Sequence, residues 1–154
     1  MRVANPRDVL SEVQTQKGKR IECTREWILN RGKFSAWSAE DKPQLLRLIG
    51  RPGIGKTMMS TFLVEELQRR LERAHGKALA YVFCDDKDEG RREPTTILRS
   101  LIQQLLLQRN KLFQHIQPDF EAQGNRLFRN SSTLCRIFKT MLTNDDALDE
   151  CNWP

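Results

Sequence analysis

The sequence predicts an α/β fold that is rich in helices, and three observations lead to this prediction. Residues 50–57 follow the pattern G-x-x-x-x-G-K-[ST], which needs a strand before it and a helix after it. The apolar run at residues 44–49 and the run at residues 78–84, which has high β propensity, both suit short buried strands. Apolar residues with helical spacing follow each run. Strands that alternate with helices around such a loop indicate the P-loop NTPase type.

Residues 1–43 are predicted to form an N-terminal helical segment that leads into the first strand. Thr24 is suited to cap a helix that begins after it. Large apolar groups follow at Trp27, Ile28, Phe34 and Trp37. Packing into the core is the favoured interpretation, because aromatic side chains are mostly buried. The alternative is that this segment walls the base of a bound nucleotide.

The loop at residues 50–57 has the chemistry of a phosphate site. Its glycines permit backbone angles and close approaches that a Cβ would block, and the freed N–H groups can form an anion-binding nest. Lys56 can reach the β- and γ-phosphates and is a catalytic candidate, while the Thr57 hydroxyl can hold Mg²⁺. The helix that starts at the loop adds its positive dipole end. The predicted nucleotide-binding residues are Gly50, Arg51, Pro52, Gly53, Ile54, Gly55, Lys56, Thr57 and Met58.

A helix is predicted over residues 58–75, before the second strand at residues 78–84. Glu66 and Arg70 form an i,i+4 pair on its polar face. The charged residues 85–93 are predicted as a solvated turn, because they lack the glycine and the final glutamate of a calcium-binding loop. The helix predicted over residues 58–75 has its apolar face at Met59, Phe62, Leu63, Leu67 and Leu71.

The C-terminal half is predicted to be helical. Thr95 or Thr96 is suited to cap one helix, a second helical stretch is broken at Pro118, and Ser131 or Ser132 is suited to cap the last helix. The first helix has its apolar face at Ile97, Leu98, Leu101, Ile102, Leu105 and Leu106. The last helix carries Leu134, Cys135, Ile137, Phe138, Met141 and Leu142.

The composition of the chain limits which cellular compartment and which classes of partner are expected. The chain has 154 residues and a net charge of +6, but acidic residues interleave with its basic clusters. A solvated helix face is therefore favoured over a nucleic-acid surface. The sequence has no apolar run of membrane-spanning length and no signal core, so the cytosol is expected and a membrane is not. The four cysteines lack C-x-x-C spacing, which favours reduced thiols over a zinc site.

Several blocks of this sequence occur together in one known family. They are residues 23–29, 34–37, 44–57, 80–84, 97–105 and 146–151. Together they resemble the start of fungal NACHT domains, a region also described as a nephrocystin-type N-terminal domain. The resemblance extends from about residue 8 to residue 151. It implies that residues 44–154 form part of a NACHT-type NTPase domain.

The resemblance also implies a function. Such proteins belong to the STAND class of signal-transducing ATPases, in which exchange of ADP for ATP opens a switch and drives oligomerisation. It implies ATP or ADP with Mg²⁺ as ligands, and protein partners or self-association through the NACHT surfaces. Asp146 would be the Walker B acid near the Mg²⁺, and Asp149 or Glu150 would be catalytic by polarising the attacking water. The sequence does not choose between ATP and GTP.

The chain departs from this family pattern in two respects. Thr143, Asn144 and Asp145 precede Asp146 where the family has a buried apolar strand, so the Walker B segment is degenerate. The family also has further strands, which leaves the expected parallel sheet incomplete and suggests a fragment. Nucleotide binding is therefore expected, with hydrolysis weak or absent.

Three alternatives remain open. The first is an interaction fragment that binds no nucleotide. The second is a small P-loop kinase, for which Arg91 and Arg92 are the only lid candidates. The third is a nucleic-acid ATPase, whose binding would depend strongly on salt.

Overall fold

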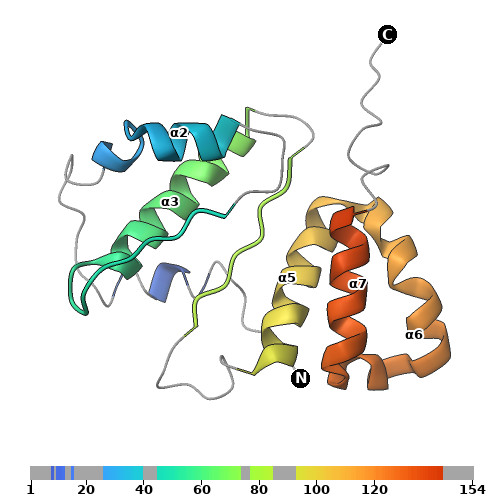
Figure 1. Cartoon of the computed structure of the whole chain (residues 1–154). Helices are drawn as coiled ribbons and strands as arrows, with labels where there is room; N and C mark the ends of the chain where they lie inside the picture. Colours follow the sequence, from blue (N-terminus) through green and yellow to red (C-terminus); the bar gives the residue numbers. More distant parts are fainter. Residues whose placement is uncertain are drawn as a thin grey trace, which may run out of the picture. The chain divides into compact units, whose positions relative to one another are not determined.

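Helices account for all the regular secondary structure that is described, so the predicted α/β fold with an incomplete parallel sheet is wrong. The computed structural model describes residues 8, 10–12, 15, 26–39, 45–73, 77–84 and 93–143, and none of them lies in a β-strand. The α-helices are α2 (Gly32–Ala39), α3 (Lys56–Leu71), α5 (Pro94–Gln108), α6 (Gln117–Gln123) and α7 (Ser131–Thr143) (Figure 1). The 3-10 helices are η1 (Glu26–Ile28), η2 (Asn110–His115) and η3 (Gly124–Arg129).

The two runs predicted as strands are elongated segments without regular secondary structure. Residues 45–50 and 77–84 have neither helix nor strand assigned, and both follow elongated paths in Figure 1. A strand requires main-chain hydrogen bonds to a neighbouring segment. At residues 77–84 the main chain bonds instead to glutamine side chains of α5. High β propensity describes how a residue fits a pleated surface, and it does not supply the neighbouring strand.

The chain divides into two compact units. One unit is Ser11–Glu66, and the other joins Met1–Leu10 to Leu67–Pro154. The predicted domain boundary between residues 43 and 44 lies outside the described residues and stays a prediction.

The unit of residues 11–66 has a small apolar core. Its buried members are Ile28, Phe34, Phe62 and Leu63, and the half-buried Leu29, Trp37, Leu46, Leu48 and Met59 pack against them. The favoured core role of the N-terminal aromatic groups is thus confirmed for Phe34 and Trp37, whose ring centroids are 5.7 Å apart. Trp27 differs, because it is 51% exposed and lies under the Arg31 guanidinium. Glu66, predicted on the polar face of its helix, is buried.

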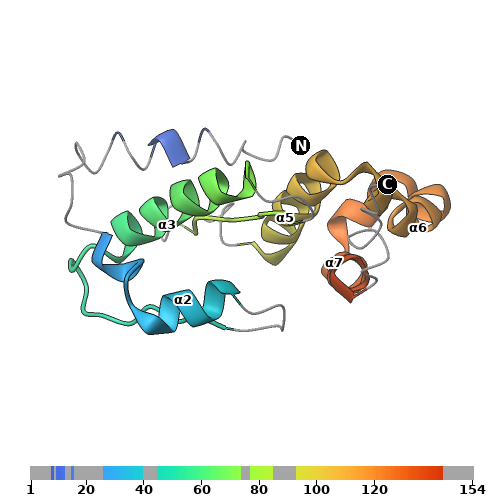
Figure 2. The ribbon, with the colours of Figure 1, turned by 90° about the horizontal axis from the view of Figure 1, so that it is seen from above.

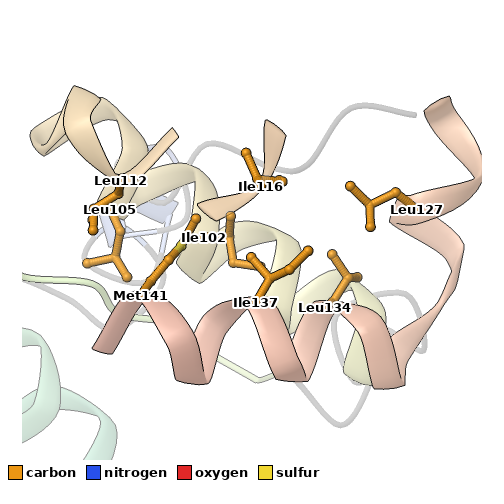
Figure 3. Close-up of a cluster of buried hydrophobic side chains, with 8 residues drawn as sticks. All are labelled: Ile102, Leu105, Leu112, Ile116, Leu127, Leu134, Ile137 and Met141. Carbon is orange, nitrogen blue, oxygen red and sulfur yellow. The ribbon is translucent and has the colours of Figure 1, made fainter. Parts of the chain in front are cut away.

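The larger unit is built on α5 and α7, which lie side by side in both views (Figure 1, Figure 2). Leucine and isoleucine side chains at helical spacing form the face between them. Ile116, Leu112 of η2 and Leu127 of η3 complete the same core, and Figure 3 shows its members pointing toward one another. The buried residues are Ile102, Leu105, Leu112, Ile116, Leu127, Leu134, Ile137 and Met141.

Two helix starts differ from those predicted. α5 begins at Pro94 with Glu93 as its N-cap residue, so neither threonine that follows is the cap. α7 is capped by Asn130, whose Oδ1 accepts a hydrogen bond from the Thr133 N–H at 3.1 Å, so neither serine that follows is the cap. The predicted break near Pro118 is present, because η2 ends at His115 and α6 begins at Gln117 with Pro118 in its first turn.

Two expectations from composition can be compared with the described residues. Cys84 and Cys135 are free thiols there, and Cys135 lies in α7 as expected. No helix in the described part of the chain combines the length and apolar character needed to cross a membrane.

Candidate functional site

Residues 50–57 form a turn that leads directly into α3. Gly53 and Gly55 have φ angles of 80° and 90°, in a region that side chains other than glycine rarely adopt. The Ile54 N–H donates to the Arg51 carbonyl at 3.4 Å across the turn. Both glycines therefore stand where the chain needs a positive φ, as the loop motif predicts.

The first glycine of the loop lies close to the Ile54 side chain. A Cβ built on Gly50 would lie 2.9 Å from Cγ2 of Ile54, closer than such atoms pack. A side chain at position 50 would therefore require the exposed Ile54 side chain to move.

Lys56 folds back over the loop. Its Nζ donates to the carbonyl of Gly50 at 2.7 Å and to the carbonyl of Arg51 at 2.9 Å. Hydrogen bonds from an ammonium group are stronger than neutral ones, so this side chain fixes the loop and holds a positive charge at it. The loop itself is open, because residues 51–56 are all exposed.

The first turn of α3 adds main-chain donors beside this charge. The Met59 N–H donates to the Gly55 carbonyl at 2.9 Å, the first α-helical hydrogen bond of the helix. The N–H groups of Lys56, Thr57 and Met58 precede it, and such groups have no partner within their own helix. They add to the positive end of the helix dipole, which favours an anion.

The structure brings together the nine residues predicted to bind nucleotide, Gly50 to Met58, in one loop and one helical turn. The predicted Walker B groups, Asp146, Asp149 and Glu150, lie outside the described residues. The described residues also contain no group of three or more His, Cys, Asp or Glu side chains placed to hold a metal ion. Anion binding by residues 50–58 and the roles of the three acids therefore stay predictions.

The sequence did not reveal two features of the structure. The main-chain acceptors of Lys56 could not be predicted, because every residue carries a carbonyl and only the turn geometry selects Gly50 and Arg51. The main-chain contacts of Gln104 and Gln108 on α5 were also missed. Their one visible signal was the four-residue spacing from Ser100 along one side of the helix.

A groove between α5 and α7 lies away from the predicted site. It is a shallow, open groove of about 680 Å³, and Leu98, Cys135, Arg136 and Lys139 are among its lining residues. The Arg136 guanidinium is already paired with the Asp119 carboxylate. The groove contains none of the residues predicted to bind nucleotide.

Comparison with known proteins assigns this chain to a family. Residues 23–153 match the family model described as "Nephrocystin 3, N-terminal". The chain is 29% identical, over an alignment of 163 residues, to the vegetative incompatibility protein HET-E-1 of Podospora anserina. That alignment covers 98% of this chain and 12% of the relative. No solved structure matches the chain.

These matches support part of the resemblance inferred from the sequence blocks. They confirm its nephrocystin-type N-terminal part and its likeness to a fungal protein. Neither match establishes a NACHT domain, which stays a prediction.

Proposed function

This chain belongs to the nephrocystin 3 N-terminal family, and on that premise we propose that it acts as a module of a larger protein and binds the phosphates of a nucleotide at residues 50–57. The observation that carries this proposal is the conformation of the loop, across which the Lys56 side chain folds. Lys56 bonds to two carbonyls of a turn that contains two glycines with positive φ, directly before a 16-residue helix.

Phosphate oxygens would replace the carbonyls of Gly50 and Arg51 as acceptors of the Lys56 ammonium. The exchange favours the ligand, because a phosphate carries full negative charge and a carbonyl does not. The N–H groups of the first turn of α3 would provide further donors. The half-buried Thr57 hydroxyl would be the chain's ligand to a Mg²⁺ ion that accompanies the nucleotide.

The proposal covers binding of ATP or ADP, and the loop does not discriminate against GTP. It does not cover hydrolysis, because the acids predicted to position the metal and the water lie outside the described residues. Phosphoryl transfer depends on such positioned charges.

A second candidate is an interaction module that binds no nucleotide. The family description and the relative's name mention no nucleotide, so the comparisons support this candidate more directly. A specific observation also favours it. Leu45, Ile49 and Ile54 are 91%, 82% and 69% exposed within the same small unit as the loop, and burying such side chains against a partner would be favourable.

A titration with a fluorescent ATP analogue, with and without Mg²⁺, separates the two candidates. Lys56→Ala should weaken binding at least about tenfold, while Lys33→Ala, which removes an exposed lysine from α2, should leave it unchanged. Circular dichroism on each variant checks that helix content is retained. A folded wild-type chain that shows no saturable binding, or equal binding by Lys56→Ala, would contradict nucleotide binding. Association with a longer relative that survives Lys56→Ala would then support the interaction module.

A further inference from the structure

Two glutamine side chains of α5 hold residues 77–84 by the main chain. The Leu79 N–H donates to Gln108 Oε1 at 3.0 Å, and Gln108 Nε2 donates to the Leu79 carbonyl at 2.8 Å. The Tyr81 N–H donates to Gln104 Oε1 at 3.2 Å, and Gln104 Nε2 donates to the Tyr81 carbonyl at 2.8 Å. We call this arrangement the glutamine clamp.

Each glutamine of the clamp makes the same pair of main-chain hydrogen bonds that a residue of a neighbouring strand would make. In an antiparallel sheet a residue exchanges both its N–H and its C=O with the residue opposite, and a glutamine amide offers the same acceptor and donor. The spacing of the two glutamines along α5 also matches the spacing of the two residues that they bind. Residues two apart in an extended chain are about 6.6 Å apart, and helical residues four apart are separated by about 6 Å along the axis. Four residues of α5 therefore span the same distance as two residues of the segment.

Both amides also make hydrogen bonds within α5. Gln104 is only 8% exposed, and its Nε2 also donates to the Ser100 carbonyl at 3.1 Å. Gln108 Nε2 donates to the Gln104 carbonyl at 2.8 Å. Beyond the end of α5, Arg109 Nη2 donates to the Lys77 carbonyl at 3.4 Å, so one side of the segment is bonded at residues 77, 79 and 81. A buried amide that is fully bonded strongly favours one arrangement.

The segment held in this way is suited to pairing with another chain. Residues 78–84 read A-L-A-Y-V-F-C, with no charge, no proline and no glycine. Short apolar windows of this kind, when their main-chain edge is exposed, are templates for intermolecular strand pairing.

We propose that the glutamine clamp masks this main-chain edge, and that its loss lets residues 77–84 pair with the same residues of a second copy of the chain. The clamp is thus a conformational device of the larger unit. It involves no nucleotide and no residue of the loop, so it stands or fails separately from the proposed function.

The test compares Gln104→Ala/Gln108→Ala with Gln103→Ala, a matched substitution at an exposed position of the same helix. Hydrogen exchange should show the Leu79 and Tyr81 amides exchanging about tenfold faster or more in the double variant, because each loses its acceptor. Sedimentation should show the double variant as dimers or larger species at concentrations where Gln103→Ala and the wild type are monomeric. A double variant that keeps its helix content and stays monomeric would overturn the proposal.

Further variants separate edge pairing from general unfolding. Val82→Lys places a charge within the segment at a position that is 38% exposed, and it should return the double variant to monomers. Phe34→Ala damages the core of the unit of residues 11–66, which contains neither the clamp nor the segment, so any aggregation that it causes should not respond to Val82→Lys. The proposal would be refuted if the double glutamine variant and the core variant associated to the same extent and Val82→Lys changed neither.

Discussion

Replacing Gly55 by alanine should destabilise the unit of residues 11–66, although nothing stands in the way of the new methyl group. Space is not the obstacle, because no atom lies within 4 Å of a Cβ built on Gly55. The cost comes from its φ of 90°, which an alanine adopts only under strain of about 1–2 kcal/mol. Loss of freedom in the unfolded chain offsets about 0.4–1 kcal/mol of this strain. The net effect is a loss of about 1 kcal/mol.

Gly32 is the matched control for this substitution. It also has no atom within 4 Å of a built Cβ, but it is the first residue of α2 and has no positive φ. Alanine there should stabilise the same unit by about 0.4–1 kcal/mol. The two variants should therefore differ by about 1.5–2 kcal/mol with opposite signs relative to the wild type.

Urea unfolding followed by tryptophan fluorescence measures this difference. Trp37 packs against the core of the unit, so a chain in which Trp27 and Trp153 are replaced by phenylalanine reports on that core alone. With a urea dependence of about 1 kcal/mol per molar, the two midpoints should lie about 1.5–2 M apart. Shifts of equal sign and size at Gly55 and Gly32 would refute the assigned backbone conformation of the loop.

Substitutions at four positions test the larger unit. Ile137→Ala should cost about 2–5 kcal/mol, because the side chain is fully buried, whereas Leu142→Ala on the same helix, 54% exposed, should change the free energy of unfolding by less than about 0.5 kcal/mol. Thermal unfolding of both variants decides this, and equal losses would contradict the packing of α7. Asn130→Ala should cost about 0.5–2 kcal/mol by removing the cap of α7, and Asn130→Asp should retain most of that stability. Asp119→Asn should cost less than about 1 kcal/mol, since the arginine that it pairs with is 60% exposed, and added salt should shrink the difference.

Features that depend on a few neighbouring residues could be predicted from the sequence. The apolar positions Ile102, Leu105, Leu134, Ile137 and Met141 repeat with helical spacing, and all are buried in one core. A helix satisfies its own main chain, so its pattern can be recognised from about a dozen residues. The exact starts were less predictable, because Asn, Ser and Thr side chains compete for the same capping position.

The predicted sheet failed for the opposite reason. A run such as residues 78–84 shows only that its side chains fit a pleated surface, and the partner must come from elsewhere in the chain. In this structure the partner is a pair of amides on α5. Gln103 and Gln104 are identical neighbours in the sequence, yet only Gln104 is buried against the segment. That choice depends on the direction in which α5 faces, which no local pattern encodes.

The shape of the loop therefore does not depend on the predicted sheet. Lys56 takes its two acceptors from residues five and six positions earlier, and the positive φ angles belong to the glycines themselves. The shape of the loop is thus produced by eight consecutive residues and the first turn of α3, with no neighbouring strand required. If the folded chain fails to bind a nucleotide while Gly55→Ala behaves as expected, the loop shape is not the cause. That result would contradict nucleotide binding even though the loop has its assigned shape, and it would leave the interaction module as the supported function.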